Sequence, residues 1–212
     1  MQRAHDTILV VDLSQHTALV TGASSGIGRA IAAALAARGA RVVAHYRSNE
    51  EGARAAINGA RGDSVVVRCD LSDKRAVDEL FLSLREQDML PTVLVANAAK
   101  AEGGAVLDEC AWERQYEQVF RAQLNPILAF LGQDDQREQR RSILVITSIY
   151  GSHGLACPDM PQYSVMKAAL NQLVSVLAQT HAPHVRVNAI APGWTDTPAW
   201  EGASEAEKQG YA

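Results

Sequence analysis

A tyrosine and a lysine four residues apart, Tyr163 and Lys167, could together carry out acid–base chemistry. They stand at the start of a stretch with helical apolar spacing, and helical residues four apart share one face. A free tyrosine titrates at about pH 10, so it is a poor acid or base at neutral pH. A nearby ammonium group favours the phenolate, and the pair therefore predicts a lowered pKa for Tyr163. An ordinary amphipathic pair on a helix surface has the same spacing. Other residues of the chain must therefore decide between a catalytic pair and a surface pair.

Ser148 adds a third polar group to this pair. It directly follows the apolar run at 142–147, which predicts a buried strand. A hydroxyl at the end of that strand can hydrogen-bond the same carbonyl oxygen that Tyr163 would protonate. A positioned acid of this kind typically contributes about 10²–10⁴ in rate.

A glycine-rich segment at 21–28 lies between an apolar run and an Ala-rich helical stretch. Gly22 allows a sharp turn, Gly26 lets a ligand approach the backbone, and Gly28 lets helix and strand pack closely. The free N–H groups and the positive dipole end of the helix can then bind a pyrophosphate. A glycine-rich turn without a ligand is the alternative interpretation.

These groups must be positioned by a regular alternation of apolar runs and helical stretches. Near-continuous apolar strands that alternate with helices predict an α/β fold, a doubly wound parallel sheet in three α/β/α layers. In such sheets ligands bind at the carboxyl ends of the strands, where the polar features of this chain fall. The expected strands are 17–20, 41–46, 64–68, 92–96, 142–147 and 185–190; the expected helices are 29–38, 50–60, 72–87, 112–131 with a kink or break at Pro126, and 163–179.

Composition predicts one domain over residues 1–212, with an N-terminal extension at 1–11 and a residual segment at 198–212. The chain is 47% hydrophobic and 21% charged, which is ordinary for a globular protein, and its net charge of −4 favours neither nucleic acid nor an anionic membrane. No apolar stretch approaches the roughly 20 residues of a membrane helix, and Ile8–Val11 is too short for a signal peptide. The three scattered cysteines lack metal-ligand spacing and predict reduced thiols. We therefore expect a cytoplasmic location and no metal site.

The ordered landmarks from about residue 12 to 197 resemble those of the short-chain dehydrogenase/reductase family of the Tyr-x-x-x-Lys type. The resemblance implies a Rossmann fold and hydride transfer between a nicotinamide cofactor and a carbonyl or secondary alcohol. It also implies that Ser148 and Tyr163 bind and protonate the substrate oxygen, while Lys167 tunes Tyr163 and holds the nicotinamide ribose. The landmarks are Thr21-Gly22-x-x-x-Gly26-Ile27-Gly28, Asp70, Asn97-Ala98, Ser148, Tyr163-x-x-x-Lys167, and Pro192-Gly193 with Thr197.

The same resemblance implies a cofactor site at the carboxyl ends of the strands. In it Asp70 would lie beside the adenine ring, although a turn residue before a helix would look the same. The implied cofactor-binding residues are Gly22, Ser24, Ser25, Gly26, Ile27, Gly28, Arg47, Ser48, Asp70, Leu71, Asn97, Ala98, Tyr163, Lys167, Pro192, Gly193, Thr195 and Thr197.

The choice of cofactor depends on the end of the second strand. Dinucleotide folds that bind NAD place an acidic residue about 20 residues past the glycines. Tyr46 holds that place, the next carboxylate is Glu50, and Arg47 and Ser48 stand between them. A guanidinium offers planar, bidentate donors that suit a 2′-phosphate, so we expect NADP(H) in preference to NAD(H). A solvated surface arginine is the alternative.

The chain departs from the family pattern in several places. Aligning the helix at 112–131 puts the family's proton-relay asparagine on Gln123, and a small shift of register would bring in Asn125 instead. Ala99 replaces a usual glycine, and the 15-residue separation of Ser148 from Tyr163 is wider than usual. After Thr197 the family's substrate-covering helices and its closing strand are missing, either because the chain is shortened or because the protein manages without them.

Without that strand the strand at 185–190 becomes an unprotected edge of the sheet. Family members commonly form dimers through the helices that correspond to 112–131 and 163–179, so we expect a homodimer. The stretch 46–50 is similar to 3-oxoacyl-carrier-protein reductases and to some sugar dehydrogenases, which does not identify the small-molecule substrate. The sequence therefore predicts an NADP(H)-dependent carbonyl reductase, and a catalytically weak dinucleotide-binding scaffold is the alternative.

Overall fold

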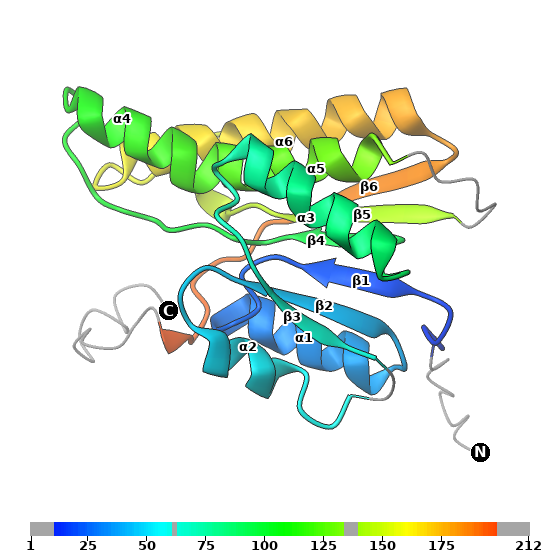
Figure 1. Ribbon diagram of the computed structural model, residues 1–212. Coiled ribbons are helices and arrows are strands. Elements are labelled where there is room, and N and C mark those ends of the chain that lie inside the picture. Colours follow the sequence, from blue (N-terminus) through cyan, green and yellow to red (C-terminus); the bar gives the residue numbers. More distant parts are fainter. Residues whose placement is uncertain (1–10, 61–62, 134–139, 199–212) are drawn as a thin grey trace, which may run out of the picture.

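The sheet is parallel throughout and has the strand order β3-β2-β1-β4-β5-β6. The computed structural model describes residues 11–60, 63–133 and 140–198. This order, with helices on both faces, confirms the doubly wound Rossmann fold that the sequence predicts (Figure 1). In the described part of the chain the strands are β1 Thr17–Val20, β2 Arg41–Tyr46, β3 Val65–Arg68, β4 Val93–Ala96, β5 Arg141–Ile146 and β6 Val185–Ile190.

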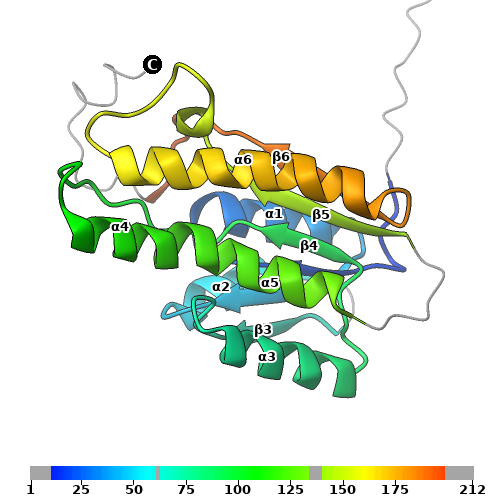
Figure 2. The same ribbon diagram turned by 90° about the horizontal axis from the view of Figure 1, so that it is seen from above.

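Helices form a layer on each face of the sheet. Helices α1 and α2 cover one face. The other face is covered by α3, by α6 and by the α4–α5 rod, a name used here for the continuous helical segment 109–131, and α6 runs beside this rod (Figure 2). The helical elements are α1 Gly26–Ala37, α2 Glu50–Ala56, α3 Lys74–Glu86, α4 Glu109–Gln115, the π-helical η1 Tyr116–Arg121, α5 Ala122–Leu131, the 3-10 turn η2 Ile149–Gly151 and α6 Pro161–His181.

Two apolar layers hold these helices to the sheet, one on each face. All four residues of β1 are buried, because alternate side chains point to opposite, equally covered faces. Leu19 belongs to the layer under α3, α5 and α6, while Val20 belongs to the layer under α1 and α2. The buried face of α1 includes Ala32 and Ala36, and such small side chains let this helix approach the sheet closely.

The carboxyl ends of the strands lie level with one another. Val20 at the end of β1 is paired with Ala44 of β2 and with Val95 of β4. The order of the strands reverses at β1, since β2 and β3 lie on one side of it and β4, β5 and β6 on the other. The loops that follow the strands of these two halves therefore lead away from each other. This is the position at which doubly wound sheets bind their ligands.

The helical rod at 109–131 differs from the sequence expectation at Pro126. Pro126 lies inside α5, which continues through it, so the predicted break is absent. The irregularity lies about one turn earlier, in the π-helical turn Tyr116–Arg121. Proline lacks the N–H that bonds to the preceding turn, and neighbouring packing compensates for that single loss. Phe130 and Ile127, both fully buried, supply this packing.

β6 pairs with β5 along its whole length, and no second partner for β6 occurs in the described residues. Val185 and Val187 are buried, whereas Arg186 and Asn188 are exposed. The predicted N-terminal extension and the predicted segment 198–212 lie almost wholly outside the described residues. No helix in the described ranges is long and apolar enough to span a membrane, and these ranges contain no cluster of metal-ligating side chains.

Candidate active site

One cavity of about 890 Å³ runs along the carboxyl ends of the strands. The loops after β2 and β3 line one end of it, and the loop after β5 together with the start of α6 lines the other. Every residue that we predicted for catalysis or cofactor binding lines this cavity except Gln123. The predicted residues on its wall are Gly22, Ser24, Ser25, Gly26, Ile27, Gly28, Arg47, Ser48, Asp70, Leu71, Asn97, Ala98, Ser148, Tyr163, Lys167, Pro192, Gly193, Thr195 and Thr197.

At the β5 end, Ser148 and Tyr163 face each other. Ser148 caps η2, and its Oγ accepts a hydrogen bond from the backbone N–H of Tyr150 at 3.2 Å. Burial raises the pKa of Tyr163, and a hydrogen bond with the Ser148 side chain offsets part of that rise. The phenol is therefore protonated at neutral pH, which is the state a proton donor needs.

Lys167 lies one helical turn after Tyr163 and is almost fully buried, at 2% exposure. Its Nζ donates a hydrogen bond of 2.7 Å to the carbonyl oxygen of Ile146 and lies 5.6 Å from the centre of the Tyr163 ring. Burial lowers the pKa of Lys167 to about 7. A buried amine loses the hydration of its charged form, so its ammonium state is costly.

Our expectation that Lys167 lowers the pKa of Tyr163 is wrong for this structure. The largest influence on Tyr163 is its own burial, and Lys167 is not among the groups that shift it. The same burial that raises the pKa of the phenol lowers the pKa of the amine.

The glycine-rich turn opens the N-terminus of α1 to the cavity. Gly22 and Gly26 have φ of 66° and 52°, a backbone region that favours glycine. Gly28 is required for packing, because a Cβ there would lie 2.2 Å from the Gly22 carbonyl oxygen. Ser25 is the N-cap of α1 but makes no side-chain cap hydrogen bond. The first N–H groups of α1 thus have no intrahelical partner and suit a diphosphate, which is the group that the family's cofactor would bring.

At the β2 and β3 end, Arg47 contacts Asp70, with Nη2 and Oδ2 3.3 Å apart. Asp70 also accepts hydrogen bonds from the backbone N–H and the hydroxyl of Ser72, at 3.0 and 2.7 Å. Asp70 is therefore a turn residue before α3 that also lines the cavity, and its position beside an adenine ring stays a prediction. Glu50 is engaged elsewhere, by the Tyr46 hydroxyl at 2.8 Å and by Arg54.

Comparison with known proteins supports the resemblance seen in the sequence. A family model described as enoyl-(acyl carrier protein) reductase matches residues 22–211. The 3beta-hydroxysteroid dehydrogenase of Mediterraneibacter gnavus is 35% identical over 192 residues, which cover 88% of this chain and 68% of the relative. The 3-oxoacyl-(acyl-carrier-protein) reductase MabA of Mycobacterium bovis is 30% identical over 196 residues, which cover 91% of this chain and 74% of the relative.

One solved structure resembles this protein over most of both chains. A short-chain dehydrogenase from Burkholderia cenocepacia in complex with NADP matches with a TM-score of 0.83 at 28% identity, over 94% of this chain and 83% of that chain. The protein belongs to the short-chain dehydrogenase/reductase family. As a member of that family it is an oxidoreductase that acts on alcohol or carbonyl substrates.

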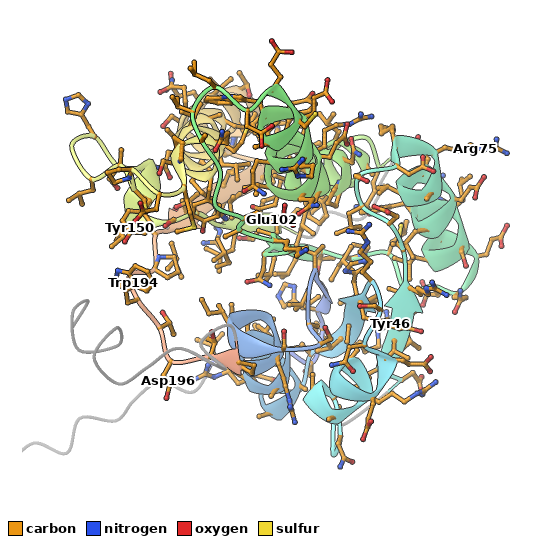
Figure 3. All side chains as sticks on the ribbon, turned by 90° about the vertical axis from the view of Figure 1, so that its left-hand side faces the viewer. Tyr46, Arg75, Glu102, Tyr150, Trp194 and Asp196 are labelled. Atoms are coloured by element: carbon orange, nitrogen blue, oxygen red, sulfur yellow. The ribbon has the colours of Figure 1, made fainter. Side chains whose placement is uncertain are left out.

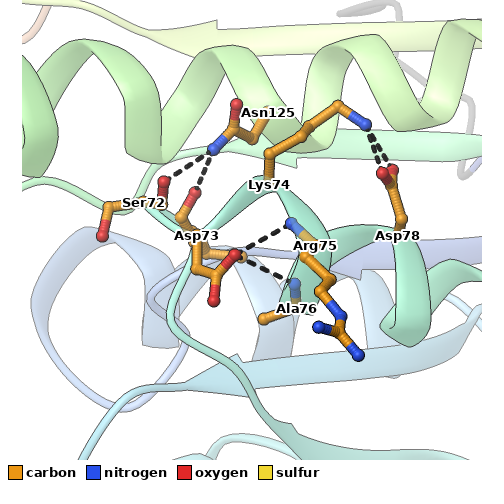
Figure 4. A network of polar contacts seen from close by, with 8 residues as sticks. Ser72, Asp73, Lys74, Arg75, Ala76, Asp78 and Asn125 are labelled. Atoms are coloured by element: carbon orange, nitrogen blue, oxygen red, sulfur yellow. Dashed lines mark hydrogen bonds and ion pairs between the residues drawn. The ribbon is translucent and has the colours of Figure 1, made fainter.

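In this short-chain dehydrogenase/reductase the two candidate relay residues lie in different places. In the amide orientation that gives both ends a partner, Gln123 accepts a hydrogen bond from Lys167 Nζ at 3.2 Å and donates one to the Ala96 carbonyl oxygen at 3.0 Å. Asn125 donates to the carbonyl oxygens of Leu71 and Ser72, at 2.8 and 3.1 Å, next to the capped start of α3 (Figure 4). Only Gln123 therefore contacts the predicted catalytic groups.

Several cavity residues were not found from the sequence. Tyr150 of η2 and Trp194 after β6 pack edge to face, with ring centres 5.8 Å apart, and Figure 3 shows them together on the side of the molecule away from Tyr46. Arg114 also lines the cavity and pairs with Glu102 at 3.4 Å. Trp194 directly follows the Pro192-Gly193 landmark, so its position in the sequence was a usable signal, whereas no pattern marked Arg114.

Proposed function

We propose that the protein is an NADP(H)-dependent oxidoreductase that transfers a hydride between the nicotinamide and a carbonyl or secondary alcohol of a small molecule. The observation that carries this proposal is the position of Ser148, Tyr163 and Lys167 at one end of a single cavity. The opposite end of that cavity holds Arg47, and the open N-terminus of α1 lies between them. A dinucleotide laid along the strand ends would span all three regions.

In the reducing direction Ser148 and Tyr163 donate hydrogen bonds to the carbonyl oxygen of the substrate. When bound, the cofactor supplies the hydride that adds to the carbonyl carbon. The O–H bond of Tyr163 breaks as its proton moves to the substrate oxygen, which leaves a phenolate. The amine of Lys167 lies 5.6 Å from the centre of this ring. With a pKa of about 7, Lys167 is able to take part in reprotonation near neutral pH.

Gln123 completes this arrangement as the residue that holds Lys167. Its side-chain oxygen and the carbonyl oxygen of Ile146 both accept hydrogen bonds from the amine. Two acceptors on a buried amine restrict its direction and partly compensate for its lost hydration. We therefore assign Gln123 the position that an asparagine holds in the family, with direct contact to the lysine.

The preference for NADP(H) rests on the residues after β2. Arg47 and Ser48 are exposed and line the cavity, so both can approach a 2′-phosphate. Glu50 does not line the cavity and is held by Tyr46 and Arg54, so no carboxylate from α2 is offered to a ribose 2′-hydroxyl. The similar Burkholderia cenocepacia structure contains NADP, which agrees with this preference.

A homodimer through the α4–α5 rod and α6 is part of the proposal. These helices lie side by side on one face of the molecule (Figure 2). These helices and η1 between them expose large apolar side chains: Tyr116 at 41%, Leu128 at 45%, Val165 at 49% and Val176 at 47%. A solvated helix pair gains nothing from such side chains, whereas a second copy of the chain would bury them.

The dinucleotide-binding scaffold without activity remains the competing function. A scaffold needs no phenol, hydroxyl and amine together at one end of its cavity, so the position of Ser148, Tyr163 and Lys167 favours the enzyme. The deciding experiment is NADPH oxidation against a panel of ketones and aldehydes. Turnover of at least one carbonyl supports the enzyme, and NADPH binding without any turnover supports the scaffold.

A further inference from the structure

A buried histidine at the end of β2 has no part in the chemistry just described. His45 is 2% exposed, yet its ring borders the cavity. Its Nδ1 lies 3.1 Å from the backbone nitrogen of Gly22, and its Nε2 lies 3.0 Å from the carbonyl oxygen of Cys69. One imidazole thus connects the glycine-rich turn after β1, the end of β2 and the end of β3.

The two partners determine where the ring hydrogen lies. The N–H of Gly22 is a donor, so Nδ1 must accept, and Nε2 must then carry the hydrogen that it donates to Cys69. This pattern requires a neutral ring. Burial lowers the pKa of His45 to about 4, so the ring stays neutral throughout the physiological range.

His45 is one of the residues that fix the glycine-rich turn. Its carbonyl oxygen also accepts the N–H of Ala23 at 2.8 Å, so two consecutive amides of the turn bond to this one residue. On the other side, the amide nitrogen of Asn97 donates to the carbonyl oxygen of Thr21 at 2.9 Å. The turn is therefore held by His45 from β2 on one side and by Asn97, just after β4, on the other.

The direction of the Gly22 amide matters to any ligand at the start of α1. Because His45 accepts the N–H groups of Gly22 and Ala23, neither can donate to a phosphate, and the donors left are the amides after Ala23, including those of the first turn of α1. The helical amides begin at Gly26, only four residues beyond Gly22 along a turn with two left-handed glycines. A turn rich in glycine is intrinsically mobile, so its fixed geometry must come from bonds of this kind.

We propose that His45 is a positioning residue for the cofactor diphosphate, because its neutral imidazole sets the glycine-rich turn in the form that presents the first amides of α1. The proposal rests on the proposed dinucleotide function, and it assigns His45 to binding and not to the chemical step. It predicts equal effects on NADPH and NADH, since both carry the same diphosphate and differ only at the ribose near Arg47.

Three variants separate the two bonds of the ring. His45→Asn keeps an oxygen close to the position of Nδ1 and so keeps an acceptor for Gly22. His45→Gln places an amide nitrogen near the position of Nε2 and so keeps the donor to Cys69. His45→Leu keeps neither bond. The readouts are the dissociation constants of NADPH and NADH by calorimetry, kcat at saturating NADPH, and thermal unfolding.

We expect His45→Leu and His45→Gln to raise both dissociation constants about ten-fold, since each leaves the Gly22 amide without its acceptor. His45→Asn should stay within about three-fold of the parent, and kcat at saturation should change little in all three. If His45→Leu does not fold, the comparison of His45→Asn with His45→Gln decides. Equal affinities for those two, or a loss of kcat without a loss of affinity, would overturn the proposal. A parent protein that binds neither nucleotide would overturn the proposed function instead.

Discussion

Arg47 and Asp70 form an ion pair, with 3.3 Å between Nη2 and Oδ2, at the end of the cavity farthest along the sheet from Tyr163. Asp70 is fixed in this position by the backbone N–H and the hydroxyl of Ser72. These bonds and the nearby Arg47 guanidinium hold the pKa of Asp70 below its usual range. An ionised carboxylate therefore stands beside the group that we assign to the 2′-phosphate. The two anions would compete for one guanidinium.

Removing the guanidinium should abolish the preference for NADPH. Arg47→Ala is expected to weaken NADPH binding about 10- to 100-fold, the usual effect of losing hydrogen bonds to a charged group. NADH has no 2′-phosphate and should lose less than about three-fold. Fluorescence titration with both nucleotides measures this, and Arg54→Ala is the matched control because Arg54 pairs with Glu50 away from the cavity.

Removing the charge of Asp70, which competes with the 2′-phosphate for Arg47, should strengthen the preference for NADPH. Asp70→Asn keeps the shape of the side chain and removes its charge, so it should raise the NADPH-to-NADH affinity ratio. The gain should be modest, about two- to five-fold, because an exposed ion pair contributes less than about 1 kcal/mol. An unchanged ratio would show that Asp70 does not compete for Arg47, even if both affinities fall together through a lost contact to the adenine.

Gln123 should affect the chemical step through Lys167. Gln123→Leu removes the acceptor at 3.2 Å from Nζ, and the misplaced amine should lower kcat about 10- to 100-fold. Asn125→Leu is the control on the same helix, because it breaks the bonds to Leu71 and Ser72 and should lower stability more than kcat. If Asn125→Leu gives the larger loss of kcat, the assignment of Gln123 is wrong.

The buried amine predicts an unusual pH dependence of stability. The pKa of Lys167 is about 7 in the folded protein and about 10.5 when solvated, so between these values the unfolded chain binds more protons. Stability due to this group therefore rises with pH, and from about pH 7 to about pH 9.5 the parent should gain about 3 kcal/mol relative to Lys167→Met. Urea unfolding of both proteins at the two pH values measures the difference. A constant difference would mean that the amine is solvated and charged throughout.

The proposed dimer can be broken from its exposed apolar face. Val176→Glu places a charge at a position that is 47% exposed in the monomer and that the dimer would bury. We expect it to convert the dimer to a monomer in light scattering, without loss of the folded state. Leu82→Glu makes the same change at a larger apolar residue, 60% exposed, on α3 and should leave the dimer intact. A parent protein that is already monomeric would contradict this part of the proposal.

The sequence predicted the sheet better than it predicted the contacts within the site. Strands such as Arg41–Tyr46 and Val185–Ile190 agree with their predicted bounds, because continuous apolar runs between turn residues are a local signal. The break at Pro126 was wrong, because the packing of Ile127 and Phe130 outweighs the loss of one helix bond. All but one of the predicted site residues line the cavity. Most of them stand just after a predicted strand, and parallel strands bring those positions to the same edge of the sheet.

What the sequence did not predict depends on burial and on pairs far apart in the chain. The raised pKa of Tyr163 comes from its burial, which spacing within one helix cannot show. The bond between His45 and Gly22 joins residues 23 positions apart through the pairing of β1 with β2. No pattern in the sequence marks a partner for His45, so this bond could not be predicted from spacing.

The central claim is that the phenol of Tyr163 donates the proton during carbonyl reduction. The most direct measurement compares the parent with Tyr163→Phe in NADPH oxidation, using a carbonyl that the parent reduces and a saturating NADPH concentration. The account predicts a loss in kcat of about 10²–10⁴ with little change in the affinity for NADPH, because only the acid is removed. A Tyr163→Phe enzyme that is as active as the parent would contradict it.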